Sequence, residues 1–76
     1  TEILTYYPNP AAGQVVFATK NTAGGELLIT DLPGRLVSRQ SISGSLTLDV
    51  SDWNPGLYIV RFNGRTIGKL VVQAGH

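Results

Sequence analysis

The 76-residue chain contains no cysteine and no methionine, and its only histidine is His76, at the end of the chain. Without cysteine there can be no disulfide, although small secreted domains often depend on disulfides for stability. Zinc lacks its preferred ligand types here. A Cys–His catalytic pair is excluded, and the terminal position of His76 argues against a Ser–His–Asp arrangement, since chain ends are usually poorly ordered. We therefore expect no enzymatic activity, no cofactor and no bound metal.

An excess of charge of one sign and long apolar runs are also missing. Six basic residues oppose five acidic residues, so the formal net charge is +1. This balance leaves no electrostatic footprint for nucleic acid or for an anionic membrane. No apolar run reaches the roughly 20 residues of a membrane-spanning helix, and no signal-peptide pattern begins at Thr1. We expect the chain to be either cytosolic or a piece of a longer precursor.

A helical repeat of apolar residues is missing as well, and short β-branched runs take its place. Nine glycines and four prolines recur at short intervals along the chain. The pattern predicts an all-β fold, an antiparallel β-sandwich of six or seven short strands spaced roughly ten residues apart. The expected strands cover residues 2–6, 14–20, 26–32, 35–42, 45–50, 57–62 and 65–73. We expect residues 1–73 to form this single domain. Residues 74–76 carry no pattern and are expected to be a tag or a cloning remnant.

Turn residues and strict alternation give more detailed predictions. LPGR (residues 32–35) fits a type II turn, because Pro33 suits its first central position and Gly34 supplies the positive φ at the second. The pair Asn63–Gly64 is typical of a type I′ hairpin turn. The alternation slips within residues 35–42, which allows for a β-bulge. Clean period-2 alternation predicts six buried side chains: Leu46, Leu48, Val50, Tyr58, Val60 and Phe62.

Several polar residues leave a functional and a structural interpretation open. The oxygen-rich segment 49–54 could hold calcium, but its Asp, Ser and Asn side chains equally suit turns, where they accept hydrogen bonds from nearby backbone N–H groups. No EF-hand spacing is present, which favours the turn. Asp31 is expected to accept backbone N–H bonds in the turn that follows it. Arg61 and Arg65 flank the hairpin turn and form either a basic patch for an anionic partner or a solvated tip whose charge protects the sheet edge.

The aromatic residues leave a similar choice. Trp53, together with Tyr6, Tyr7 and Tyr58, could form a platform for sugars. The alternative places Trp53 over the open end of the sandwich and Tyr58 in the core. A domain this small needs its large apolar side chains for stability, which favours the second interpretation.

Five short motifs follow one another along the chain: YPNP, D-x-x-G, L-D-x-S, P-G-x-Y and K-L-V-V. In this order and at these spacings they resemble the C-terminal sorting domain of type IX (Por) secretion system substrates, over residues 7–73. The motif residues are Tyr7, Pro8, Asn9, Pro10, Asp31, Gly34, Pro55, Gly56 and Tyr58.

The resemblance implies an immunoglobulin-like sandwich, in agreement with the strand count. It implies a non-enzymatic domain at the C-terminus of a fused passenger. Such a domain directs its passenger from the periplasm through the outer-membrane type IX translocon, to the cell surface or the medium. A sortase-like protease commonly removes the domain afterwards. On this basis we expect translocon recognition to depend on the last strand and its end, Lys69, Leu70, Val71, Val72 and Gln73, and the turn residues of the motifs to preserve the fold.

The YPNP segment has a physical interpretation of its own. Pro8 and Pro10 cannot donate ladder hydrogen bonds, and they bias Tyr7 and Asn9 toward extended conformations. The segment is therefore expected to be a stiff start that stops an upstream passenger from continuing the sheet. A second hypothesis for the whole chain is an immunoglobulin-like or fibronectin-like accessory module, or a carbohydrate-binding module, of a secreted enzyme. Fold alone does not separate the two functions.

Overall fold

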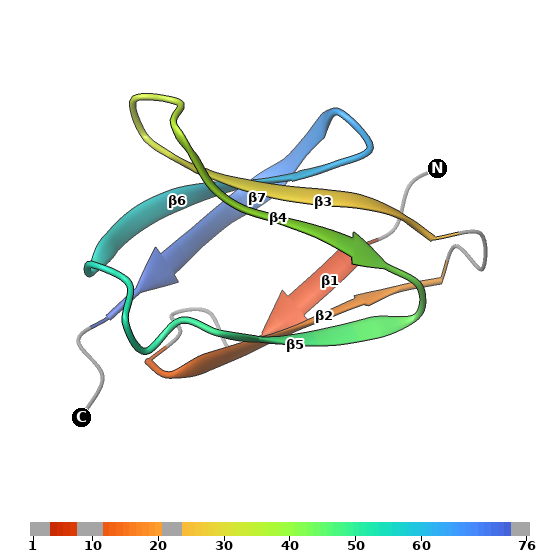
Figure 1. Cartoon of the computed structure of the whole chain (residues 1–76), viewed down its shortest axis with the longest axis horizontal. Coiled ribbons are helices and arrows are strands. Elements are labelled where there is room, and N and C mark those ends of the chain that lie inside the picture. Colours follow the sequence, from red (N-terminus) through yellow and green to blue (C-terminus); the bar gives the residue numbers. More distant parts are fainter. Residues whose placement is uncertain (1–3, 8–11, 21–23, 74–76) are drawn as a thin grey trace.

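The computed structural model describes residues 4–7, 12–20 and 24–73. Its strands are β1 (Leu4–Tyr7), β2 (Gln14–Thr19), β3 (Gly25–Asp31), β4 (Leu36–Ile42), β5 (Ser45–Asp49), β6 (Gly56–Phe62) and β7 (Arg65–Val72). They form two antiparallel sheets that pack face to face (Figure 1), in the orders β1-β2-β5 and β4-β3-β6-β7. The predicted all-β sandwich is confirmed. No helix that could cross a membrane occurs in the described ranges.

The strand order is that of an immunoglobulin-like sandwich. In such folds strands C, F and G lie side by side in one sheet, with an added strand C′ beside C, and strands A, B and E lie in the other. Here β3, β6 and β7 take the places of C, F and G, β4 takes that of C′, and β1, β2 and β5 complete the second sheet. This arrangement makes β1 and β5 the edges of the smaller sheet, and β4 and β7 the edges of the larger one.

The core is filled by alternate residues of both sheets. The buried apolar side chains are Leu4, Val15, Phe17, Leu27, Ile29, Ile42, Val50, Tyr58, Val60, Phe62, Leu70 and Val72. Four of the six side chains expected to be buried are among them. Leu46 and Leu48 are only half-buried, although they pack against the core. Both belong to the edge strand β5, which pairs with β2 alone among the described strands, so solvent reaches the inner side of β5 at the rim of the sandwich.

The hairpin turn and the bulge agree with the sequence prediction. Asn63 and Gly64 hold φ of +53° and +82°, as a type I′ turn requires. The slip in the fourth strand is a bulge: Ile29 pairs with Ser38 and Thr30 with Leu36, which leaves Val37 as the extra residue. A second bulge lies in β7, where Ile67 is the extra residue opposite the Val60–Arg61 step.

The turn after β3 lies one residue earlier than predicted. The Gly34 N–H donates to the Asp31 carbonyl oxygen at 3.0 Å, so the hydrogen-bonded turn covers residues 31–34 and Pro33 is its second central residue. A type II turn needs positive φ at that position, which the proline ring excludes. The prediction of a type II turn at 32–35 is therefore wrong. Gly34 does hold positive φ, +99°, but as the residue that follows the central pair.

Two predictions concern residues outside the described ranges. The first expected strand, 2–6, includes residues 2 and 3, whereas β1 is described from Leu4. The tag or cloning remnant expected at 74–76 also lies outside these ranges, so it stays a prediction.

Candidate functional site

The last strand divides the five expected recognition residues between two sides of the sheet. Leu70 and Val72 are 0% and 2% exposed and belong to the core, where they pack against the facing sheet. Lys69, Val71 and Gln73 are exposed. A partner can therefore contact Lys69, Val71 and Gln73 on the folded domain, whereas the other two stabilise the fold that presents them.

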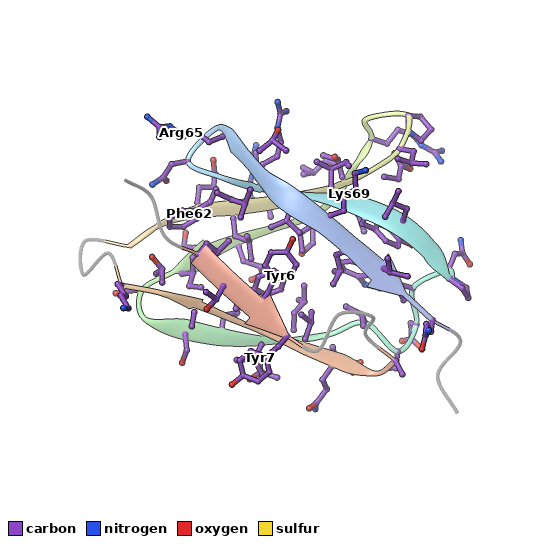
Figure 2. The ribbon with its side chains drawn as sticks, turned by 180° about the vertical axis from the view of Figure 1, so that it is seen from behind. Tyr6, Tyr7, Phe62, Arg65 and Lys69 are labelled. Carbon is purple, nitrogen blue, oxygen red and sulfur yellow. The ribbon has the colours of Figure 1, made fainter. Side chains whose placement is uncertain are left out.

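Tyr6 connects the first strand with the last across the two sheets. Its hydroxyl donates a hydrogen bond to the carbonyl oxygen of Lys69 at 2.8 Å. Its ring packs against Phe17, with ring centroids 5.5 Å apart. Figure 2 shows the Tyr6 side chain between β1 and β7, while Tyr7 points to the other side of β1. Thus β1 and β7, one edge strand of each sheet, are joined by a side-chain hydrogen bond as well as through the core.

Gly68 provides the space for this contact. A Cβ atom at position 68 would lie 2.5 Å from the Tyr6 hydroxyl oxygen, closer than such atoms approach in proteins. Any larger residue would push the hydroxyl away from the carbonyl of Lys69. Sequence reasoning did not identify Tyr6 and Gly68 as a pair. The available signal was a glycine in the interior of a strand, which often marks a close approach of another group.

Burial affects the ionisation of the Tyr6 phenol. Removal from water raises the pKa of Tyr6 above its ordinary value of 10.0, because the charged phenolate loses hydration. The phenol therefore stays protonated at neutral pH and keeps the proton that it donates to Lys69. The family motif contains the neighbouring Tyr7, which is 60% exposed. Pro8, Asn9 and Pro10 lie outside the described residues, so the stiff-start interpretation of YPNP stays a prediction.

The P-G-x-Y motif fixes the loop that leads into β6. The Tyr58 hydroxyl donates to the backbone carbonyl of Asn54 at 2.6 Å, across Pro55 and Gly56. The Trp53 ring lies against Tyr58, with centroids 5.1 Å apart. Immunoglobulin-like sandwiches often carry such a tyrosine near the start of strand F, bonded to backbone a few residues upstream. The motif thus has a structural role in this chain.

The four aromatic residues considered for a sugar platform do not share an exposed surface. Tyr58 is buried, and Trp53 and Tyr6 are partly buried and packed against the core. Tyr58 is in the core, as the structural interpretation predicted, and Trp53 packs against that core. Tyr7 is the member of this set that is strongly exposed.

Asp31 and Asp49 hold their turns. Asp31 accepts a hydrogen bond from the Arg35 backbone N–H at 2.8 Å and pairs with the Arg35 guanidinium at 3.0 Å, so its structural role is confirmed. Asp49 accepts from the Ser51 N–H at 2.9 Å. Hydrogen bonds from the side chain and backbone of Ser51 lower the pKa of Asp49. Within the described ranges no three His, Cys, Asp or Glu residues are grouped so that they could hold a metal ion.

The outer face of the four-stranded sheet combines apolar and basic side chains. We define this outer face by the side chains that point away from the core: Glu26, Leu28, Thr30, Leu36, Arg39, Ser41, Leu57, Ile59, Arg61, Thr66, Lys69 and Val71. In register, Leu28 lies between Arg39 and Arg61, and Ile59 lies between Thr30 and Lys69. Lys69 and Val71 of the expected recognition segment therefore belong to a larger surface.

Comparison with known families identifies the class of protein. The sequence matches the family described as "Secretion system C-terminal sorting domain" over residues 5–73. The chain therefore belongs to the C-terminal sorting domains of type IX secretion substrates. Searches of curated proteins and of solved structures found no match.

Membership in this family defines the general function. The domain is a type IX secretion sorting signal, which implies contact with the type IX machinery and export to the cell surface or the medium. Sorting-signal domains are typically non-catalytic.

Proposed function

We propose that this domain directs a covalently fused N-terminal passenger from the periplasm through the type IX translocon, and that a sortase-like protease then removes the domain. The domain itself catalyses no reaction. The observation that carries the proposal is the family match, which covers residues 5–73 and therefore all of the sandwich except Leu4, including most of both edge strands joined by Tyr6. A complete folded unit of this kind can act as a portable signal.

Within this proposal the motifs divide into two groups. Asp31, Gly34 and the P-G-x-Y residues preserve the turns and loops of the sandwich. The exposed residues of Lys69–Gln73 contribute to recognition by the translocon. Support for this division comes from burial, because a residue in the core is not accessible to a partner of the folded domain.

The proposal is tested by transplanting the domain. A periplasmic signal peptide, a fluorescent reporter and residues 1–76 are joined in that order and produced in a bacterium with a type IX system. We expect the reporter at the cell surface or in the medium, and in the periplasm when the translocon is deleted. Equal export with and without the translocon would contradict the proposal.

Removal of the domain is tested in the same cells. The exported reporter should lack the sorting domain by mass spectrometry, and it should keep the domain when the sortase-like protease is deleted. A reporter that stays in the periplasm and binds polysaccharide would instead support the accessory or carbohydrate-binding module.

A further inference from the structure

The outer face of the four-stranded sheet has a composition that packing does not explain. Its apolar side chains point away from the core and are interleaved with polar and basic ones: Leu57 pairs with Val71, whereas Ile59 lies between Thr30 and Lys69. Leu28, Leu57 and Ile59 are half-buried, and Leu36 and Val71 are exposed. Long basic side chains can cover part of such apolar surface with their aliphatic stems while their charges stay in water.

Charge is concentrated on the same sheet. Five of the six basic residues lie in the four-stranded sheet or in the turns of its hairpins: Arg35, Arg39, Arg61, Arg65 and Lys69. Only two acidic residues, Glu26 and Asp31, lie there, and they pair with Arg39 and Arg35. Arg61 and Arg65 have no ion pair among the described residues. Salt bridges among the described residues therefore do not account for Arg61 and Arg65.

The opposite face of the sandwich provides an internal comparison. The outward side chains of the three-stranded sheet are Thr5, Tyr7, Gln14, Val16, Ala18, Ser45, Thr47 and Asp49. Asp49 is the one charged member of this set. A requirement for solubility would act on both faces alike. The difference indicates a specific role for the basic, apolar side.

We propose that the outer face of the four-stranded sheet is the docking surface for a protein of the type IX machinery whose contact surface is apolar and acidic. The inference rests on the proposed sorting function and assigns its contact surface. Complementary charge guides such a partner to the face and fixes its orientation, and the apolar side chains of the face lose contact with water on binding.

A protein fits this face better than an anionic membrane does. Membrane attachment through basic residues usually requires clusters of about four to eight lysines and arginines. The outer face carries three, Arg39, Arg61 and Lys69, and one of them is paired with Glu26 at 3.3 Å. Its apolar side chains lie on a sheet surface rather than on an amphipathic helix with a large apolar face.

The test uses matched variants of the reporter fusion. Arg61→Gln and Ile59→Thr change the proposed surface. Lys20→Gln and Val16→Thr make the same kinds of change on the three-stranded sheet or next to it, where Lys20 is exposed and Val16 half-buried. Each variant domain is also melted in isolation, so that export is compared at equal stability. Arg61 is exposed, which keeps Arg61→Gln folded even if Ile59→Thr is not.

We expect Arg61→Gln and Ile59→Thr to reduce export about fivefold or more, as for the minority of residues that dominate an interface, while both controls are exported like the wild type. A free wild-type domain produced in the periplasm should compete with the fusion, and a free Arg61→Gln domain should not. These results would support the docking surface.

Other outcomes separate the two levels of the proposal. If the wild-type fusion is exported through the translocon and all four variants match it, the docking surface is overturned while the sorting function stands. If the wild type itself is not exported, both fail. Binding to phosphatidylglycerol vesicles that is lost in Arg61→Gln, together with unchanged export, would overturn the assignment to a protein partner.

Discussion

The inward and outward sides of β7 differ in almost every property. On the inward side, Leu70 and Val72 are buried and Gly68 leaves room for the Tyr6 hydroxyl. On the outward side, Lys69 and Val71 are exposed and belong to the basic outer face of the sheet. The same eight-residue strand therefore contributes to the core and to the surface at alternate positions.

Because of this difference, deletion of the whole strand would not separate the two roles. Removal of the last strand would delete the proposed contact residues and would also take Leu70 and Val72 out of the core, so loss of export would have two explanations. Because the two roles fall on alternate residues, single substitutions can separate them.

Leu70→Ala should have the largest effect. The side chain is fully buried, so its truncation leaves a cavity and should reduce the free energy of unfolding by about 2–5 kcal/mol. Val71→Ala, on the neighbouring exposed position, is the control and should change it by less than about 1 kcal/mol. Urea denaturation of both variants measures the difference. Equal losses would show that the inward and outward sides are not distinct.

Gly68→Ala should lower the free energy of unfolding by about 1–3 kcal/mol. The new methyl group displaces the Tyr6 hydroxyl and breaks its hydrogen bond to the Lys69 carbonyl oxygen. The cost depends on the hydroxyl. In a Tyr6→Phe background the nearest ring carbon is 3.8 Å from the new Cβ, an ordinary contact. In that background, Gly68→Ala should change the free energy of unfolding little. A double-mutant cycle with no coupling between the two positions would refute the close contact.

Tyr6→Phe alone should reduce stability by about 0.5–1.5 kcal/mol, the usual contribution of one hydrogen bond. The ring contact with Phe17 remains. In a domain of this size, each kcal/mol of lost stability lowers the melting temperature by about 4–8 °C. Tyr7→Phe is the matched control, since Tyr7 is exposed, and its melting temperature should stay close to that of the wild type. The opposite order of the two variants would contradict the assignment of Tyr6 as the connecting residue.

The contribution of Tyr6 should also depend on pH. Burial raises the pKa of Tyr6 in the folded domain above 10.0, so its contribution is fully present below pH 10 and is lost as the pH rises through the raised value. Ionisation also removes the proton donated to Lys69. The stability difference between the wild type and Tyr6→Phe should therefore be constant below about pH 10 and shrink as the pH rises above that value. A difference that stays constant over this range would show that the phenol is not desolvated.

The sequence predicted which faces are buried better than it predicted how deeply. Alternation in residues 57–62 correctly identified Tyr58, Val60 and Phe62, because β6 is a central strand that is covered by neighbours on both sides. The same alternation in residues 45–50 overestimated the burial of Leu46 and Leu48. Period-2 patterns show which way a side chain points, whereas burial depends on strand order, which the local pattern does not contain.

Contacts between distant residues were the least predictable part. Pro33 and Gly34 allow two alignments of one turn, and the backbone hydrogen bond to Asp31 selects the one that the sequence did not favour. Tyr6 and Lys69 are 63 positions apart, so their contact exists only in the folded sandwich. The division of β7 was not predicted either, because Leu70, Val71 and Val72 form an unbroken apolar run whose pattern does not show that Val71 points outward.

The proposal that the exposed side of β7 takes part in recognition can be tested with Lys69→Ala in the reporter fusion. Only the side chain is removed, and the backbone carbonyl that accepts the Tyr6 bond stays. Stability should change by less than about 0.5 kcal/mol, as for most exposed positions, while export falls and Lys20→Ala is exported normally. Normal export of Lys69→Ala, with export of Leu70, Val71 and Val72 variants following stability alone, would contradict the claim.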